Sequence, residues 1–225
     1  MIVIKVGGSQ SRGTGLPALA QEIGRLCARY PVLVVPGGGV FADVVRDHYR
    51  RYTLSETTAH RMALLAMDQY GCLLGDLVPG SVLVTDILSA RLVVERRKTP
   101  ILLPSSLLIQ ADPLPHSWQV TSDAIAAWVA GLLSSSHLIL LKDVDGLYAQ
   151  NDITQLILQI TVEELACHRG GVDEYLATVL ASVDLETWVI NGQHPERVIE
   201  LLQTGRTLGT RIVRGTKHHL KEMEL

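Results

Sequence analysis

The sequence predicts a three-layer α/β fold, in which an open, mostly parallel β-sheet lies between two layers of helices. Short apolar runs alternate with longer helical stretches along the chain. Some of these runs are continuously apolar, as in Leu138-Ile-Leu-Leu141, and such strands are typical of a parallel sheet covered on both faces. A chain of 225 residues could form one large α/β domain or two small ones. Because we find no repeat or obvious linker, we expect a single domain over residues 1–225.

The predicted strands are short aliphatic and β-branched runs, and in chain order they are Ile2–Val6, Val32–Val35, Ser81–Val84, Pro100–Leu103, His137–Leu141, Trp188–Ile190 and Thr210–Val213. The predicted helices are longer stretches with apolar residues at helical spacing, namely Pro17–Ala28, Val40–Tyr52, Thr57–Leu74, Ser122–Leu133, Val162–Cys167, Val172–Leu180 and Pro195–Leu202. The longest loop is expected over Ala111–Trp118, because Pro113 and Pro115 disfavour regular structure there.

The composition is typical of an intracellular enzyme. Hydrophobic residues make up 47% of the chain and aromatic residues only 4%, so the core must be mainly aliphatic. A net charge of -3 argues against a nucleic-acid partner. The cysteines Cys27, Cys72 and Cys167 match neither a disulfide framework nor a zinc site, and no metal-ligand set is predicted. Without a signal peptide or an apolar run of membrane-spanning length, we expect no membrane partner and a cytoplasmic location.

The first predicted strand carries an unusual lysine and ends in a glycine pair, Lys5-Val-Gly-Gly-Ser9. A lysine inside a β-branched strand suits burial poorly unless its ammonium group has a task at the strand end. We expect that group to be solvated, and Gly7 and Gly8 to let the backbone approach a bulky anion. A plain strand and turn would also explain the pattern, but a second cluster, Pro36-Gly-Gly-Gly39, favours a phosphate site.

The segment Val120-Thr-Ser-Asp123 opens a strongly apolar helix. Thr121, Ser122 or Asp123 could simply cap that helix. Alternatively, Asp123 projects from the helix start towards the segment Lys5–Ser9 and orients ammonium groups or a metal-bound phosphate. Both roles can hold at once.

The segment Lys142-Asp-Val-Asp-Gly146 directly follows the most apolar predicted strand. Asp143, Asp145 and Gly146 would suit a plain turn. However, ligands of open α/β sheets bind outside the carboxyl ends of the strands, where Lys5 and the two glycine clusters are also expected. Several cationic or N–H-rich strand ends at one edge favour a polyphosphate site.

Taken in order, the K-x-G-G-S start, P-G-G-G, T-S-D-A, K-D-V-D-G-L-Y and the final N-G…G-T resemble the amino acid kinase family. The motifs are individually weak, but their ordered set spans nearly the whole chain. The resemblance implies the fold of that family, with ATP and Mg²⁺ bound by residues 121–225 and the phosphoryl acceptor bound by residues 1–120.

The resemblance also implies roles for single residues. Lys5 would neutralise the transferring γ-phosphoryl group, and Asp123 would hold the lysines in place. Backbone donors would bind the phosphates, and they belong to Gly7, Gly8 and Ser9. The acceptor would face Gly37, Gly38 and Gly39. The nucleotide pocket would be lined by the segment after the fifth predicted strand, through Lys142, Asp143, Asp145, Gly146 and Tyr148. Positioning and charge stabilisation provide most of the catalysis in such a reaction.

One segment departs from the family pattern. Many members carry G-G-M-x-x-K near the nucleotide, whereas this chain has Gly170-Gly-Val-Asp-Glu-Tyr175, with Tyr175 where the lysine would fall. Either Lys142 substitutes for that lysine, or the activity is weaker or altered.

Within the family, the runs Pro36–Arg46, Ala59–Gly71 and Leu114–Asp123 look most like a compact subgroup that phosphorylates aminomethylfuranmethyl phosphate to the diphosphate in methanofuran biosynthesis. Arg46 would help to bind the acceptor phosphate, and Asp43 or Asp68 its amine. Arg46 and Asp43 could equally form a surface helix pair, and His60 with Asp68 an exposed or dimer-facing stripe. Met62 and Met67 are expected in the core.

Other functions stay open at this point. An isopentenyl phosphate or uridylate kinase-like enzyme would share the reaction type, and a non-catalytic nucleotide- or oxyanion-binding protein would share the fold. We also expect a homodimer or larger homo-oligomer through residues 57–74. The apolar residues of that helix are too dense for one buried face: Ala63, Leu64, Ala66, Met67 and Tyr70.

Overall fold

The structure, a computed structural model, describes residues 1–149 and 152–215. The described residues form an eight-stranded sheet in the order β3-β4-β2-β1-β5-β9-β10-β8. Its strands are β1 (Ile2–Val6), β2 (Val32–Pro36), β3 (Ser81–Val84), β4 (Thr99–Leu102), β5 (His137–Lys142), β8 (Gln159–Thr161), β9 (Glu186–Asn191) and β10 (Thr210–Val213). Every neighbouring pair is parallel except β9 and β10, so the predicted mostly parallel sheet is confirmed.

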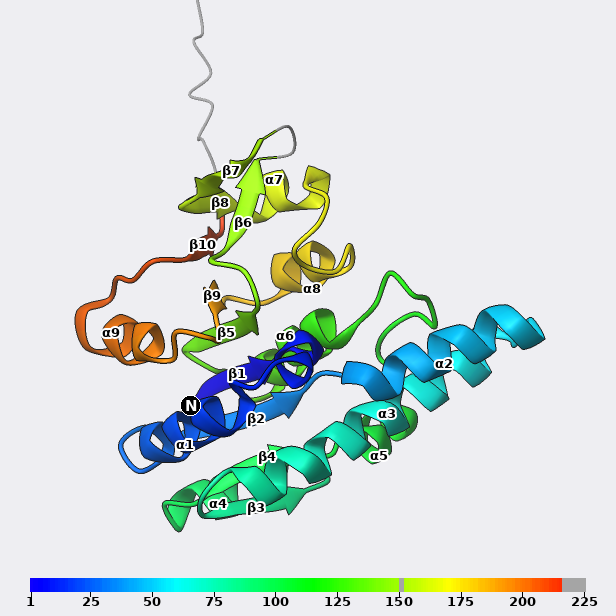
Figure 1. Ribbon diagram of the computed structural model, residues 1–225, viewed down its shortest axis with the longest axis horizontal. Helices are drawn as coiled ribbons and strands as arrows, with labels where there is room; N and C mark the ends of the chain where they lie inside the picture. The colour runs from blue at the N-terminus through cyan, green and yellow to red at the C-terminus, as the bar shows by residue number, and fades with distance from the viewer. Residues whose placement is uncertain (150–151, 216–225) are drawn as a thin grey trace, which may run out of the picture.

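Helices cover both faces of the sheet (Figure 1). The alternation of residues along the strands between two hydrophobic cores reflects these three layers. On β1, Val3 packs into one hydrophobic core and Ile4 into the other. The first core is covered mainly by α4 (Ile87–Glu95), α6 (Ser122–Leu132), α7 (Val162–Cys167) and α8 (Leu176–Ser182). The second is covered by α1 (Leu16–Cys27), α9 (Glu196–Thr204) and the end of α3 (Glu56–Leu77).

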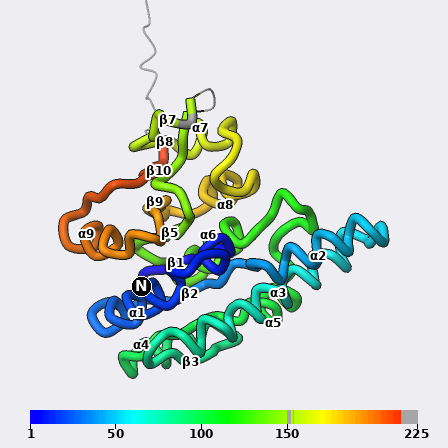
Figure 2. The backbone as a smooth tube through the Cα atoms, in the orientation of Figure 1, coloured from blue at the N-terminus to red at the C-terminus, as the bar shows by residue number. Residues whose placement is uncertain are grey.

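The helices α2 (Gly39–Tyr52) and α3 pack against each other and extend beyond the sheet (Figures 1 and 2). Thr53, with a left-handed φ of 50°, ends α2, and the Ser55 hydroxyl caps α3 by accepting a hydrogen bond from Thr58 N. The loop between α5 (Ser105–Ala111) and α6, predicted from its prolines, returns to lie against α2. This arrangement leaves a cavity between α2, α3 and the loop.

Several elements were missed by sequence analysis. They are the 3-10 helix η1 (Gly8–Arg12), α4, α5, β8 and the antiparallel hairpin β6 (Leu147–Ala149) with β7 (Asp152–Ile157). In addition, α8 begins at Leu176 and not at the predicted Val172. The segment before it cannot continue the helix, because Gly170 and Gly171 have φ of +90° and +80° and Asp173 binds the start of α6.

The strand register brings the predicted functional segments to one edge of the sheet. Lys5 on β1 pairs with Val35 on β2 and Leu140 on β5, and Lys142 pairs with Asn191 on β9. Because these strands are parallel, their carboxyl ends share that edge, as expected for a ligand site in an open α/β sheet. No helix in the described part of the chain is long and apolar enough to cross a membrane.

Candidate active site

A buried carboxylate lies between two lysines at this edge of the sheet. Asp123, in the first turn of α6, contacts Lys5 Nζ through Oδ1 at 2.9 Å and Lys142 Nζ through Oδ2 at 2.6 Å. The exposed fractions of the side chains are 5% for Lys5, 2% for Asp123 and 15% for Lys142. The expectation that the Lys5 ammonium group is solvated is therefore wrong. Its solvation is replaced by the ion pair with Asp123, which the sheet register and α6 bring beneath it.

The electrostatics of this cluster follow from its burial. Burial favours a higher pKa for Asp123, but the charges and hydrogen bonds of Lys142 and Lys5 outweigh it and lower the pKa well below the ordinary value. Burial lowers the pKa of Lys5, an effect that Lys142 increases and Asp123 only partly offsets. Asp123 is thus held ionised, with two cations fixed beside the edge where a ligand can bind.

Asp173, which sequence analysis did not select, lies next to this cluster. Its Oδ2 accepts hydrogen bonds from Thr121 N at 3.0 Å, Thr121 Oγ1 at 2.9 Å and Ala124 N at 2.8 Å. Its own N–H donates to Asp123 Oδ2 at 3.3 Å. Burial and the nearby charge of Asp123 raise the pKa of Asp173 to about 6. Asp173 therefore caps α6 from another segment. Of the three predicted cap candidates, Thr121 occupies the N-cap position, and its side chain makes no cap hydrogen bond.

The two glycine loops pack directly on each other. A Cβ on Gly8 would lie 2.4 Å from Gly39 N, and Gly39 itself has φ of +56°. The N–H groups of Gly7 and Gly37 are occupied, because they donate to Leu141 O and Val6 O. Gly8 and Ser9 begin η1, whereas Gly38 and Gly39 lie at the start of α2, so these residues are positioned where backbone donors lack helical partners.

The segment after β5 contributes unequally to the site. Asp145 is paired with Arg197 and accepts a hydrogen bond from Asn191 Nδ2 at 3.1 Å. Gly146 packs against Thr210, where a Cβ would lie 2.5 Å from Oγ1. Asp145 and Gly146 therefore both contribute to the structure of this turn. Asp143 is exposed and Tyr148 is half-buried on β6, so their predicted contacts with a nucleotide remain predictions.

A cavity of about 220 Å³ opens beside the glycine loops, between α2, α3 and the loop that precedes α6. Its apolar wall includes Leu64, Met67 and Ile125. Its polar lining includes Arg12, Asp43, Arg46, Glu56 and His60, together with Gly8, Ser9, Gly38, Gly39, Thr121 and Ser122. The predicted acceptor residues Gly38, Gly39, Asp43 and Arg46 are thus brought together, whereas Gly37 is buried behind them.

A second carboxylate between two cations lines this cavity. Asp43 Oδ1 pairs with Arg46 at 3.0 Å, and its Oδ2 pairs with Arg12 on η1. Arg46 also lies 4.8 Å from the ring centre of Trp118, which comes from the loop before α6. The Asp43–Arg46 pair therefore exists as predicted, but it lies at the cavity and not only on a helix surface. Arg12 and Trp118 were not predicted as site residues, because no motif or periodicity near them in the sequence indicates that they contact α2.

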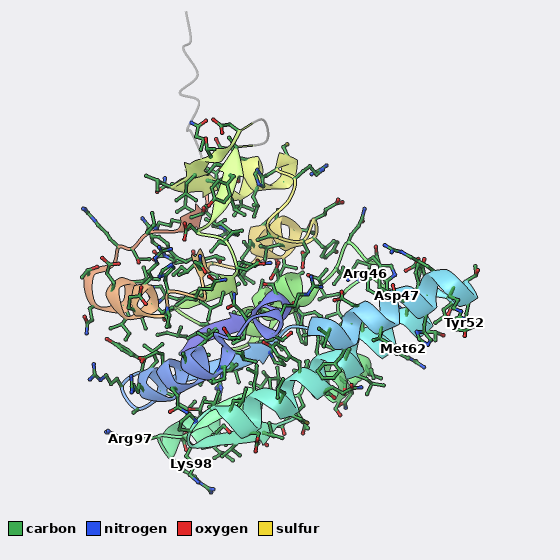
Figure 3. All side chains as sticks on the ribbon, in the orientation of Figure 1. Arg46, Asp47, Tyr52, Met62, Arg97 and Lys98 are labelled. Carbon is green, nitrogen blue, oxygen red and sulfur yellow. The ribbon has the colours of Figure 1, made fainter. Side chains whose placement is uncertain are left out.

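The structure corrects the expectations for α3. Asp68 does not face the cavity, since its carboxylate accepts hydrogen bonds from Ser105 N and Oγ at the start of α5. His60 does line the cavity and stacks on His116, with ring centres 4.5 Å apart, so the predicted exposed stripe is wrong. The alternative that this stripe faces a partner copy stays a prediction. Met67 is buried and also lines the cavity, whereas Met62 is only partly buried (Figure 3).

Comparisons with known proteins show the family of this chain. The model of the amino acid kinase family matches residues 1–184, and the chain therefore belongs to this family. It is 31% identical to the [5-(aminomethyl)furan-3-yl]methyl phosphate kinase of Methanocaldococcus jannaschii, over 95% of this chain and 98% of that protein. It is 23% identical to a uridylate kinase of Methanococcoides burtonii, over 95% of this chain and 99% of that protein.

Solved structures share the fold. The uridylate kinase from Archaeoglobus fulgidus superposes with a TM-score of 0.75 at 21% identity, covering 94% of this chain and 99% of that one. The UMP kinase from Bacillus anthracis gives 0.74 at 17% identity, with 96% of each chain covered. The predicted family and fold are confirmed, and the chain is a phosphotransferase.

Proposed function

We propose that this member of the amino acid kinase family transfers the γ-phosphoryl group of ATP to a phosphomonoester and so forms a diphosphate. The acceptor that we propose is [5-(aminomethyl)furan-3-yl]methyl phosphate, the substrate named for the relative from Methanocaldococcus jannaschii. Because ATP is an intracellular nucleotide, we assign the reaction to the cytoplasm.

One observation carries this proposal: the cavity beside the buried lysine cluster is lined by two arginines but has only one aspartate between them. Arg12, Asp43 and Arg46 together leave one positive charge beside the glycine loops, which suits an acceptor that already bears a phosphate. Glu56, which also lines the cavity, lies at the start of α3 and accepts a hydrogen bond from the Tyr49 hydroxyl. The apolar wall and a volume of about 220 Å³ suit a small ring system. Asp43 has both oxygens paired, so we no longer assign the amine of the acceptor to it or to Asp68.

We assign the nucleotide to the half of the chain formed by residues 121–225 and the acceptor to residues 1–120. Lys142 and the backbone donors of Gly8 and Ser9 would hold the phosphates, with Asp143 and Tyr148 nearby on the segment after β5. Among the described residues, no group of three or more His, Cys, Asp or Glu side chains could hold a metal ion. Mg²⁺ is usually held by substrate phosphates, waters and one or two carboxylates, so we propose that it arrives on the nucleotide and neutralises part of the phosphate charge.

The residues of this chain provide charge and position for the transfer. Asp123 holds Lys5 and Lys142 at fixed distances, so both cations are oriented before the substrates bind. Lys5 stabilises the charge that develops on the transferring phosphoryl group. The attacking oxygen of a phosphomonoester is already anionic, so the reaction requires no general base.

A panel of ATP-dependent reactions tests the proposal. The purified protein would be assayed with aminomethylfuranmethyl phosphate, isopentenyl phosphate, UMP, acetylglutamate and aspartate. We expect the highest kcat/KM for aminomethylfuranmethyl phosphate. Preference for isopentenyl phosphate or UMP would keep the reaction type but overturn the acceptor, and preference for an amino acid would overturn both.

A second candidate function is nucleotide or oxyanion binding without turnover. It is favoured by Tyr175, which stands where many family members have a lysine and which is only partly buried at the start of α8. Tight binding of ATP with no transfer to any acceptor in the panel would support this alternative.

We also propose that the protein forms a homodimer or larger oligomer through α3. The reason given from sequence needs correction, because Leu64, Ala66, Met67 and Tyr70 are buried within the chain. The apolar residues that α3 exposes are instead Leu65, at 51%, and Leu73, at 39%. A monomeric mass by light scattering at micromolar concentration would contradict this proposal.

A further inference from the structure

Asp173 is a largely buried carboxylate whose two oxygens have different surroundings. Oδ2 accepts three hydrogen bonds from Thr121 and Ala124, at 2.8–3.0 Å. Oδ1 is buried and has no hydrogen-bond partner among the described residues. A buried oxygen without a partner is costly when it carries negative charge, but it can hold a proton without loss of the bonds to Oδ2.

The charges around Asp173 are balanced only while no ligand is bound. Asp123 faces it from α6 and Lys5 from β1, while Glu174 and Tyr175 follow it on its own segment. Lys142 completes the group through its ion pair with Asp123. Glu174 is exposed, so its charge is screened by solvent. The two lysines and two aspartates of the buried group sum to zero, so a bound polyphosphate would make this low-dielectric region strongly negative.

We propose that Asp173 is a positioning residue of the nucleotide site that takes up one proton when the nucleotide phosphates bind. This inference rests on the proposed function. The proton comes from solvent and bonds to Oδ1; no other bond breaks, and it returns to solvent when the phosphates leave. Uptake gives the Lys5–Asp123–Lys142–Asp173 group a net charge of +1 towards the bound anion, while Oδ2 continues to cap α6.

The proton goes to Asp173 and not to Asp123 because of their different partners. Asp123 is held ionised by two lysines within 2.9 Å. No cation of the described residues forms an ion pair with Asp173, and its pKa is already raised to about 6 by burial and by Asp123. A phosphate nearby raises the pKa further, so uptake occurs between about pH 6 and the higher pKa of the complex. Nucleotide affinity should therefore fall as pH rises through this interval, by at most tenfold per pH unit.

Calorimetry of the full chain measures this uptake directly. The magnesium complex of a non-hydrolysable ATP analogue would be titrated into the protein at pH 7, in two buffers with different ionisation enthalpies. We expect the wild type to take up a substantial fraction of one proton and the Asp173→Asn variant almost none. The asparagine carbonyl can still accept the bonds that cap α6. The matched control is Asp47→Asn, an exposed aspartate on α2 outside the cavity, which should behave as the wild type (Figure 3).

The outcomes separate the inference from the proposed function. Absence of nucleotide binding in both wild type and Asp47→Asn would contradict the proposed function. Binding with equal proton uptake in wild type and Asp173→Asn would overturn the role of Asp173, whatever its effect on stability. Should Asp173→Asn not fold, infrared difference spectra of the wild type decide: a new protonated-carboxyl band on nucleotide binding supports the inference, and no such band overturns it.

Discussion

Two clusters in this protein have the same charge pattern in different surroundings. Asp123 lies between Lys5 and Lys142, and its side chain is 2% exposed. Asp43 lies between Arg12 and Arg46, and its side chain is 39% exposed. The first cluster is enclosed by β1, β5 and α6, whereas the second lines the cavity between η1 and α2.

The difference in burial gives the clusters different properties. Charges removed from water interact strongly and depend on each other, so the Asp123 cluster has one stable arrangement. Exposed pairs contribute little to stability and can exchange partners with a ligand. The buried cluster is therefore suited to holding cations in place for the transfer, and the exposed one to binding an acceptor that enters and leaves.

The largest effect is expected for Asp123→Asn. The change leaves two lysine ammonium groups facing a neutral amide in a buried site, so we expect destabilisation of about 3–5 kcal/mol. We also expect kcat to fall at least about a hundredfold with little change in the KM for ATP, because Asp123 orients groups that act in the transition state. Asp43→Asn should cost about 0–1 kcal/mol. Thermal unfolding and steady-state kinetics of both variants make the comparison.

Loss of stability alone in Asp123→Asn, with kcat unchanged in the folded fraction, would reduce Asp123 to a structural residue. Equal destabilisation by Asp43→Asn would remove the distinction between the two clusters.

Lys5→Ala should have the next largest effect. Removing one cation from the transition state costs about 3 kcal/mol, or roughly a hundredfold in rate. Because Lys5 is buried against Asp123, we also expect a lower melting temperature. Lys5→Met, which keeps most of the volume, distinguishes lost charge from lost packing. Turnover of Lys5→Ala at the wild-type rate would contradict the assignment of the catalytic cluster.

Arg46→Ala should act on the acceptor and not on stability. It removes a cavity cation and its contact with Trp118 while leaving Arg12 on Asp43, so we expect the KM for the acceptor to rise about tenfold. The KM for ATP, kcat and the melting temperature should change little. An unchanged acceptor KM would show that the exposed cluster does not bind the substrate.

A smaller effect is expected on the pH dependence of stability, where Asp123 and Asp173 should behave differently. The pKa of Asp173 is raised to about 6, so its ionisation costs stability above that pH, and the cost is removed as pH falls through 6. The pKa of Asp123 is lowered, so its stabilisation is present at both pH 7.5 and pH 5.5. Relative to Asp173→Asn, the wild type should therefore gain stability between pH 7.5 and pH 5.5. Parallel curves for the two proteins would contradict this assignment.

The sequence by itself determined the parallel sheet and the edge at which the site forms. Continuously apolar strands such as Leu138–Leu141 require cover on both faces, and parallel strands place their carboxyl ends together. Lys5, Asp123 and Lys142 could be selected because each lies at the end of a strand or the start of a helix whose position follows from that fold.

Only the tertiary structure decided which partners these residues have. Asp173 meets Asp123 across 50 positions of sequence, and Arg12 meets Asp43 across 31. Local patterns also did not predict that Lys5 is buried or that His60 lines the cavity. They did not predict that Asp68 accepts hydrogen bonds from the start of α5. Local residue preferences and periodicity act over a few residues, whereas the dielectric surroundings and ion partners of a side chain depend on how distant elements pack.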